Sequence, residues 1–469
     1  MMKSAYSLRM SKSKLILHIA ISLAFIFWLR LWKTWASHER LQKQHPRLRQ
    51  TVFEGSGIGG RWHIPTKWLD DAADLPTELT VSPKTTLEAA QLAFYLARSQ
   101  SRYIANSSIP LILHQSWYSM TAASWSPLIQ DYVESWLAVC AGESPLAVGV
   151  SQNDDNLDEM AYILWDNAGI DLFVKEYESA SWETYLALPI PVERVDLFRV
   201  AVLRWFGGVY SDIDTKPLRH PVSWIEPTDI ESWEDISENR TYSLSSVSDR
   251  PIYSPPSDAS PFYSMLYEKS TNASSRDRNS PSIGAIVGIE ADLPPDSDKY
   301  WRAGYGYPVQ ITQWALAFAP HHPISTRFIS AVDADVKSLQ KQNKLHDAYA
   351  VDLTGPVQFT AVIKEWLESV AGLRWHALTG LHDRGKTKTV TDVLLLPITG
   401  FSPGRGFRNN MGSRPITDHS ARLLHGFQGS WRGSFDLVPE FGKICRTLFG
   451  RCRTLSKTPT HNVPRMDWQ

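Results

Sequence analysis

The sequence predicts an α/β fold with one main domain, and three observations support this. Segments with helical spacing of apolar residues alternate with short apolar runs of strand length along the chain. Residues 192–206 have helical spacing, Gly207 and Gly208 end that helix, and a short strand follows at Val209 and Tyr210. The 469 residues leave room for one large domain or two ordinary ones, and no internal repeat divides them.

An apolar run near the N-terminus predicts a membrane anchor. It is long enough to span a bilayer, and Arg30 near its end can extend its charge to the interface. A cleaved signal peptide is the alternative, but Trp35 makes the following Ala36-Ser37 junction a poor cleavage site. The predicted division begins with a cytoplasmic tail at 1–14, an uncleaved signal-anchor at 15–35 and a polar stem at 36–108. A catalytic domain at 109–431 and a basic C-terminal tail at 432–469 follow.

Composition excludes two classes of protein. A net charge of −1 argues against a nucleic-acid binder that depends on global charge. Three cysteines are too few for a disulfide scaffold, although Cys445 and Cys452 could pair or remain thiols. Asn106, Asn239 and Asn272 begin tripeptides that fit N-glycosylation, a pattern that also arises often by chance.

Local patterns predict the other elements of the main domain. The expected helices are 128–139, 167–175, 309–323 and one that opens at Pro356, and the expected strands are 109–113, 161–165, 283–292 and 392–403 with a turn. Residues 226–281 are rich in Ser, Pro and Asp, so surface loops are expected there.

The central motif is the pair Asp212 and Asp214. In an extended backbone, residues two apart point to the same side, so the two carboxylates suit a divalent cation with oxygen ligands. Asp196 and Arg199 lie three apart on the preceding helix and share a face. A salt bridge within that helix is the alternative explanation for the second pair.

Together these residues form the pattern D-x-x-R followed by G-G-x-Y-x-D-x-D, which resembles the DXD sugar transferases. Within that superfamily the chain resembles glycosyltransferase family 32, the fungal initiation-specific α-1,6-mannosyltransferases of the Golgi. Shorter stretches extend the similarity from about residue 109 to 431: H-Q-x-W at 114–117, K-P-L at 216–218, G-I-E-A-D at 288–292, Q-W at 313–314, T-G-P at 354–356 and L-P-I-T at 396–399.

The resemblance implies a Rossmann-like GT-A domain that uses Mn²⁺ or another divalent cation and takes GDP-mannose as donor. It implies a retaining transfer of α-1,6-mannose to the core N-glycan, by a single-pass Golgi membrane protein with a lumenal catalytic domain. Assembly with other Golgi mannosyltransferases is a further expectation, and a nucleic-acid partner is not expected.

Specific residues then receive expected roles. Asp212 and Asp214 are expected to be catalytic and to bind the metal, with His425 as a third metal ligand. Donor binding is expected from Asp196, Arg199, His114, Gln115, Tyr210, Ser430 and Trp431, and acceptor binding from Glu290 and Asp292. Core packing is the alternative for His114, His425, Ser430 and Trp431, and a solvated loop is the alternative for Glu290 and Asp292.

Three other functions share part of the pattern. Enzymes that mannosylate inositol phosphoceramide contain the same acidic core, but the downstream stretches favour the N-glycan enzymes. Residues 212–215 also fit D-x-D-x-T of haloacid-dehalogenase-type phosphatases, which need a downstream acidic pair, whereas the pairs at 70–71 and 154–155 lie upstream. An inactive glycan-binding homologue is the third alternative, which the complete acidic motif disfavours.

Overall fold

The computed structural model describes most of the chain from residue 45 to residue 427. The described residues are 45–49, 55–72, 75–145, 158–245, 253–273, 282–294, 300, 304–404 and 409–427, with positions 22, 24, 25, 27 and 28. In this part of the chain, no helix is both long and apolar enough to cross a bilayer. Most of the predicted anchor at 15–35, the 432–469 tail, Cys445 and Cys452 lie outside the described residues.

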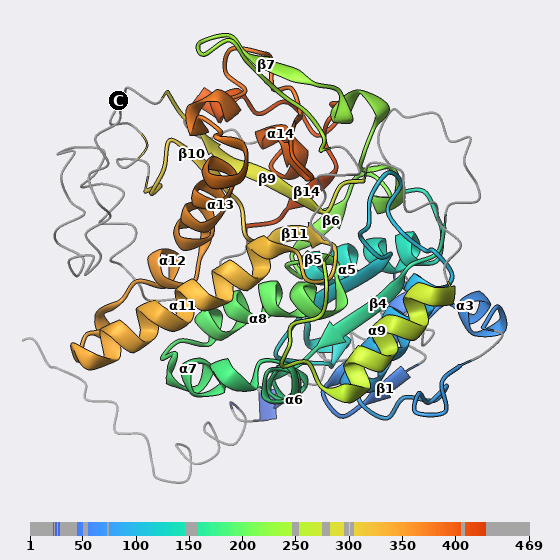
Figure 1. Cartoon of the computed structure of the whole chain (residues 1–469). Coiled ribbons are helices and arrows are strands. Elements are labelled where there is room, and N and C mark those ends of the chain that lie inside the picture. The colour runs from blue at the N-terminus through green and yellow to red at the C-terminus, as the bar shows by residue number, and fades with distance from the viewer. Residues whose placement is uncertain are drawn as a thin grey trace, which may run out of the picture.

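A 10-stranded mixed sheet forms the centre of the molecule (Figure 1), which confirms the predicted α/β class. Pairing is parallel at β4–β3, β3–β5 and β9–β13, and antiparallel at the other contacts along the sheet. The strands in sheet order are β1 (Gly55–Gly57), β2 (Gly60–His63), β4 (Ala161–Trp165), β3 (Ile112–Ser116), β5 (Gly208–Ser211), β11 (Ala315–Phe318), β9 (Ala285–Asp292), β13 (Val393–Leu396) and β12 (Lys388–Val390), and β10 (Val309–Ile311) pairs with β9.

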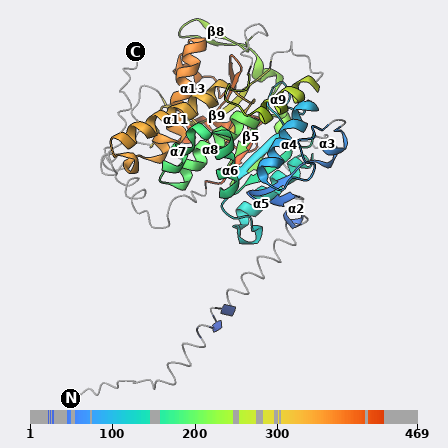
Figure 2. The same ribbon diagram turned by 60° about the horizontal axis from the view of Figure 1, so that its bottom comes forward.

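Helices pack on this sheet and on one another. α8 and α11 run side by side in front of β5 and β11 in Figure 1, and α2 lies against α5 in Figure 2. Side-chain caps begin three of the helices: Thr85 for α4, Ser126 for α5 and Asp166 for α6. The helices are α2 (Pro46–Arg49), α3 (Thr66–Asp70), α4 (Thr86–Ser99), α5 (Pro127–Cys140), α6 (Asn167–Tyr177), α7 (Trp182–Ala187), α8 (Pro191–Phe206), α9 (Pro261–Ala273), α11 (Pro323–Lys341), α12 (Ala350–Leu353), α13 (Pro356–Ala371) and α14 (Ile398–Phe401).

The helix, glycine pair and strand around the acidic motif are confirmed. α8 begins with Pro191, whose missing N–H costs nothing at the first helical position. Gly207 and Gly208 follow at φ 64° and 96°, backbone conformations that glycine adopts without strain. A Cβ at position 208 would lie 2.4 Å from the Ile112 carbonyl oxygen, so glycine also permits the close approach of β5 to β3.

The helix predicted for residues 309–323 is wrong. These residues form β10 and β11, and the next helix, α11, begins only at Pro323. β11 pairs antiparallel with both β5 and β9, so its residues complete the middle of the sheet. A short apolar run buried on both faces does not show by its periodicity whether it is helix or strand, and here sheet pairing decided the outcome.

The predicted stem at 36–108 also differs from the structure. Within that range, β2 pairs with β4 of the main sheet and Trp62 is buried. α4 is buried along most of its length, including Leu92, Phe94 and Leu96. The segment from about residue 55 therefore belongs to the α/β body, because its apolar side chains complete the core of that body.

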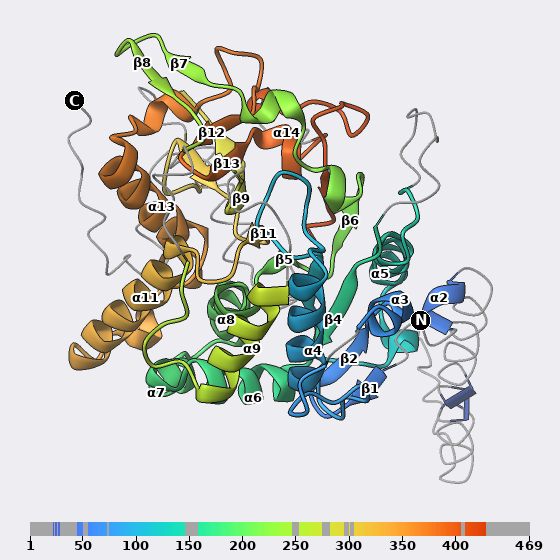
Figure 3. The same ribbon diagram turned by 45° about the vertical axis from the view of Figure 1, so that its right-hand side comes forward.

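Residues 226–281, expected to be surface loops, contain two packed elements. α9 lies beside α4 in Figure 3 and contributes the fully buried Tyr263. A separate hairpin forms from β7 (Trp233–Asp235) and β8 (Arg240–Tyr242), and Arg374 pairs with Asp235 to hold it.

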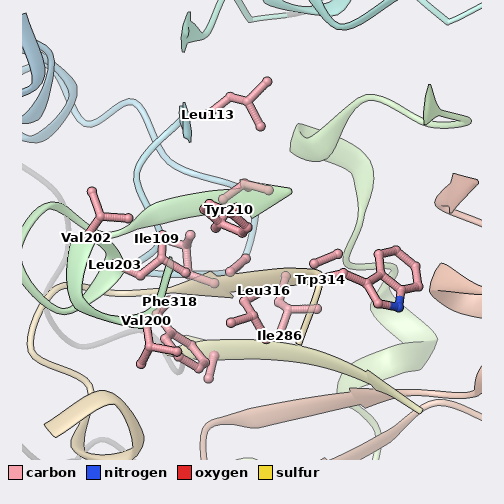
Figure 4. Close-up of a cluster of buried hydrophobic side chains, with 14 of the residues drawn as sticks. Ile109, Leu113, Val200, Val202, Leu203, Tyr210, Ile286, Trp314, Leu316 and Phe318 are labelled. Atoms are coloured by element: carbon pink, nitrogen blue, oxygen red, sulfur yellow. The ribbon is translucent and has the colours of Figure 1, made fainter. Parts of the chain in front are cut away.

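Figure 4 shows the main core next to the acidic motif, where Leu203 of α8, Tyr210 of β5 and Leu316 of β11 pack together.

Candidate active site

The carboxylates of the acidic motif lie immediately after β5. A second, two-stranded sheet next to them pairs β6 (Thr215–Pro217) with β14 (Leu423–His425), and it sets His425 opposite Thr215. Side-chain ligand atoms of Asp212, Asp214 and His425 all lie within 4.8 Å of one another. Residues more than 200 positions apart in the sequence are thus brought into one cluster by the β6–β14 pairing.

His425 is held firmly in this cluster. Its Nε2 lies 3.2 Å from Asp214 Oδ1, and its ring stacks on Trp314 with centroids 4.2 Å apart and planes 6° from parallel. The next residue, Gly426, donates its N–H to the Asp214 carbonyl at 2.7 Å. A Cβ on Gly426 would lie 2.9 Å from a Leu128 methyl and 3.1 Å from that carbonyl, so glycine lets the C-terminal strand approach the motif.

Arg199 joins the two predicted pairs into one ionic network. Its Nη1 lies 3.0 Å from Asp196 Oδ1, and its Nη2 lies 3.2 Å from Asp212 Oδ1. The sequence left open whether Asp196 and Arg199 form a salt bridge within the helix or act in the site. The structure places this salt bridge in α8 and also extends it to the first carboxylate of the acidic motif.

The backbone of Asp212 is fixed from three directions. Its N–H donates to the Trp314 carbonyl at 2.8 Å. Its carbonyl accepts from Thr215 Oγ1 at 2.6 Å and from Gln115 Nε2 at 3.1 Å. Trp136 in turn donates to Thr215 Oγ1 at 3.2 Å. This turn is therefore set before any ligand arrives, as a preorganised site requires.

Burial and neighbouring charges shift the pKa values of the residues in the ionic network. It raises the pKa of Asp196 to about 6, against the opposing effect of Arg199. Burial likewise raises the pKa of Asp212, and the charge of Asp214 adds to that rise while Arg199 opposes it. For Arg199 itself burial disfavours the charge, but Asp212 and Asp196 outweigh it and raise its pKa above the usual range. The guanidinium therefore stays charged between its carboxylates.

The cluster fits a divalent cation by its chemistry and its charge. Two carboxylates and an imidazole form a ligand set compatible with manganese. Arg199 pairs with Asp196 and Asp212, and Asp214 lies beside Asp212 in the cluster. Three carboxylates therefore lie near one guanidinium, which gives the region an excess of negative charge. His425 Nδ1 is buried and has no hydrogen-bond partner among the described residues, while the opposite ring nitrogen faces Asp214.

Three residues expected to bind the donor instead have partners inside the protein. His114 is fully buried in the middle of β3, with Nε2 3.2 Å from the Gly207 carbonyl, and burial lowers its pKa to about 3. This burial and this contact favour the packing explanation for His114. Gln115 and Tyr210 are also buried, and each bonds to Asp212: Gln115 to the carbonyl, and Tyr210 Oη to Oδ1 at 3.2 Å.

The two residues expected to bind the acceptor are also engaged. Gln310 Nε2 donates to Glu290 Oε1 at 2.6 Å. Asp292 accepts from Thr379 Oγ1 at 2.6 Å and from the Gly380 N–H at 2.7 Å. Both side chains are buried, which contradicts the solvated-loop alternative and leaves them bound to neighbouring segments of the protein. Ser430 and Trp431 lie outside the described residues.

Several residues that complete the cluster received no role from the sequence patterns. Trp314 covers His425, Thr215 holds the turn, and Thr354 Oγ1 donates to Asp196 Oδ2 at 3.0 Å. Trp314 and Thr354 lie in the Q-W and T-G-P stretches of the resemblance, which is the one signal that singled them out. Their contacts depend on the tertiary fold, which no local spacing reveals.

Comparisons with known proteins agree with this site. Residues 150–232, which contain the acidic motif, match the family described as "Glycosyltransferase sugar-binding region containing DXD motif". The initiation-specific α-1,6-mannosyltransferase of Schizosaccharomyces pombe is 32% identical over 252 residues, which cover 53% of this chain and 49% of that protein. The enzyme of the same name from Candida albicans is 25% identical over 311 residues, 61% of this chain and 66% of that protein.

The matched regions thus span about half to two thirds of these relatives. A shorter match, 27% identical over 106 residues, relates 23% of this chain to 23% of a mannosyl phosphorylinositol ceramide synthase of Saccharomyces cerevisiae. Among solved structures, the PaToxG glycosyltransferase is 14% identical with a TM-score of 0.29 over 62% of this chain and 80% of that chain, too distant to carry an argument. Residues 150–232 thus match the DXD-containing glycosyltransferase family, and the chain is similar to initiation-specific α-1,6-mannosyltransferases over 53% to 61% of its length.

Proposed function

We propose that this chain transfers mannose from GDP-mannose, with Mn²⁺, to a core N-glycan in α-1,6 linkage. The observation that carries the proposal is the cluster of Asp212, Asp214 and His425, which lies at the acidic motif of the family. Two relatives named for this activity support the choice of sugar and linkage.

The contacts of the side chains suggest a separate role for each in metal binding and in positioning. Asp212, Asp214 and His425 would hold the cation, which when bound neutralises the leaving diphosphate. Arg199 stays charged and keeps Asp212 in place through its 3.2 Å contact. The hydrogen bonds to the Asp212 backbone keep the turn from rearranging when the donor arrives.

A retaining outcome is part of the proposal. GDP-mannose and the proposed product both have an α linkage, so the configuration at the anomeric carbon would be kept. No residue of the sequence stands out as a covalent nucleophile, and we favour attack of the acceptor on the same face that the diphosphate leaves. Proton NMR of the product distinguishes the outcomes, because a β linkage contradicts retention.

The acceptor is the least constrained part of the proposal. Transfer to inositol phosphoceramide is the second candidate, because a synthase of that lipid class matches over 106 residues. The N-glycan enzymes match over 252 and 311 residues, well beyond the acidic core, and this favours the N-glycan acceptor. The same reasoning supports a Golgi protein with an N-terminal anchor and a lumenal catalytic domain.

The deciding experiment uses the purified full chain in detergent with Mn²⁺. Several nucleotide sugars are supplied, first alone and then with either a core N-glycan or inositol phosphoceramide, and release of the nucleoside diphosphate is measured. We expect turnover with GDP-mannose and the N-glycan. Turnover with the lipid alone would favour the second candidate, and no turnover with any nucleotide sugar would contradict the proposal as a whole.

A further inference from the structure

Thr354 makes an unexpected contact with the ionic network of the active site. It is fully buried and ends α12, immediately before the turn into α13. Its hydroxyl donates to Asp196 Oδ2 at 3.0 Å, across 158 positions of sequence. The Ala350 carbonyl lies at 3.3 Å from the same hydroxyl. The single proton favours the nearer carboxylate, since hydrogen bonds to a charged acceptor are stronger than those to a neutral one.

Gln313 closes this contact into a ring. The side-chain Nε2 of Gln313 donates to the Thr354 backbone carbonyl at 2.8 Å. The backbone carbonyl of Gln313 accepts from Arg199 Nη1 at 3.4 Å. Arg199 Nη1 also lies 3.0 Å from Asp196 Oδ1, and this ion pair completes the ring. Each oxygen of the Asp196 carboxylate therefore has one partner, Thr354 or Arg199. Gln313 links these two partners to each other.

Arg199 transmits this arrangement to the acidic motif. One of its terminal nitrogens is bound to Asp196 and the other to Asp212 at 3.2 Å. If Asp196 turned away, Arg199 would keep Asp212 as its one carboxylate partner among the described residues. The guanidinium would then pair more strongly with that carboxylate and compete with a cation for it.

We propose that Thr354 is a positioning residue for the metal and donor site, acting through Asp196 and Arg199. The hydroxyl holds Asp196 so that Arg199 is shared between two carboxylates, which leaves Asp212 free to bind the cation. Neither the acidic motif nor the 150–232 family match includes this residue. The proposal rests on the proposed function, because it assigns Asp212 to a metal site.

The test compares side chains at position 354 that differ mainly in the hydroxyl group. The first pair is the native protein and Thr354→Val, which replaces the hydroxyl by a methyl of similar size. The second pair is Thr354→Ser and Thr354→Ala. Mn²⁺ affinity of the full chain is measured by electron paramagnetic resonance, alongside kcat and KM for GDP-mannose. Removal of a direct partner of a metal ligand typically weakens metal binding about tenfold or more, and Thr354 lies two residues further out, so its removal should weaken binding by up to about tenfold. We expect that loss in the Val and Ala variants, a similar loss in kcat/KM, and near-normal values for Ser.

Thr360→Val serves as the matched control. Thr360 is a fully buried threonine in α13 that donates to the Pro356 carbonyl at 2.7 Å and accepts from the Ile311 N–H at 3.0 Å. This variant should lose stability but keep its Mn²⁺ affinity. Equal affinities of the Ser and Ala variants, or an equal loss in Thr360→Val, would overturn the proposal.

Folding and activity are separated by the same set of measurements. Circular dichroism shows whether each variant folds, and failure of both hydroxyl-free variants to fold would count against a positioning role. If the native protein transfers no sugar, the proposed function fails, and Mn²⁺ affinity still decides the role of Thr354. If the native protein binds no Mn²⁺, both proposals fail.

Discussion

Trp314 lies flat on His425, with ring centroids 4.2 Å apart and planes 6° from parallel. The two side chains come from distant segments of the chain: Trp314 immediately precedes β11, and His425 ends β14. The indole covers one face of the imidazole, and the Trp314 carbonyl accepts the Asp212 N–H. Trp314 thus contacts the cluster at both the Asp212 backbone and the His425 imidazole.

This contact leads to the first prediction. Trp314→Ala should weaken Mn²⁺ binding and transfer about tenfold, because the imidazole loses the surface that orients it. Trp314→Phe should keep most of both, since a phenyl ring can still stack. The measurement is Mn²⁺ titration of transfer activity in the three proteins. Equal values for the Ala and Phe variants would show that stacking is not what orients His425.

The second prediction concerns the two carboxylates. Asp212→Asn and Asp214→Asn should each reduce Mn²⁺-dependent transfer about a hundredfold or more, because the leaving diphosphate loses its metal. Unfolding free energy should change little for Asp212→Asn, since burial already disfavours the charge of that group.

Asp70→Asn, an exposed carboxylate at the end of α3, is the control for the loss of one charge. Its transfer rate should equal that of the native protein. A normal rate in either motif variant, measured on folded protein, would remove that residue from the metal site.

Glycine at position 208 gives the third prediction. Gly208→Ala should destabilise the protein by about 3 kcal/mol or more, because a methyl group would lie 2.4 Å from the Ile112 carbonyl at a φ of 96°. Gly304→Ala is the matched control: its φ is 89°, but no atom of the described residues beyond its chain neighbours lies within 4 Å of the added methyl. Denaturant unfolding should show a much smaller loss for Gly304→Ala, and equal losses would mean that the close approach of β3 and β5 is not limiting.

The sequence was most informative where structure is local. The helix over 192–206, its glycine stop and the strand that follows depend on neighbouring residues, and the structure confirms each of them. The adjacency of Asp212 and Asp214 followed from the same stretch. Their proximity to His425 was expected from the resemblance alone, because it depends on the pairing of β14 with β6.

The differences between expectation and structure share a physical cause. Residues 309–323 were predicted from local pattern, but pairing with two flanking strands decides their state. Distant contacts likewise engage the side chains of His114 and Asp292, through a buried carbonyl and the Thr379 segment. Polar residues at strand ends suggest a binding site whether they face a ligand or another segment of the protein. Thr354 and Trp314 received no role from the sequence because the residues they contact in the site lie far away in the sequence.

The fourth prediction concerns Glu193 and the pH dependence of stability. This glutamate is fully buried in the first turn of α8, where one oxygen accepts the Ile190 N–H at 3.1 Å and the other has no partner. Burial raises its pKa from 4.5 to about 7, with the charge of Asp196 adding to the rise and the Ile190 N–H opposing it. Between those two values the folded protein therefore holds a proton that the unfolded chain has released.

Stability should consequently fall as the pH rises through this window, and the loss should be complete above about pH 7. Glu193→Gln keeps the acceptor for Ile190 and removes the charge, so its stability should not show this component. The variant and the native protein should be about equally stable near pH 4.5, and the variant should become more stable by up to about 3 kcal/mol at pH 8. Denaturant unfolding at several pH values measures the difference. A gap between the two proteins that does not change with pH would show that Glu193 titrates alike in the folded and unfolded chains.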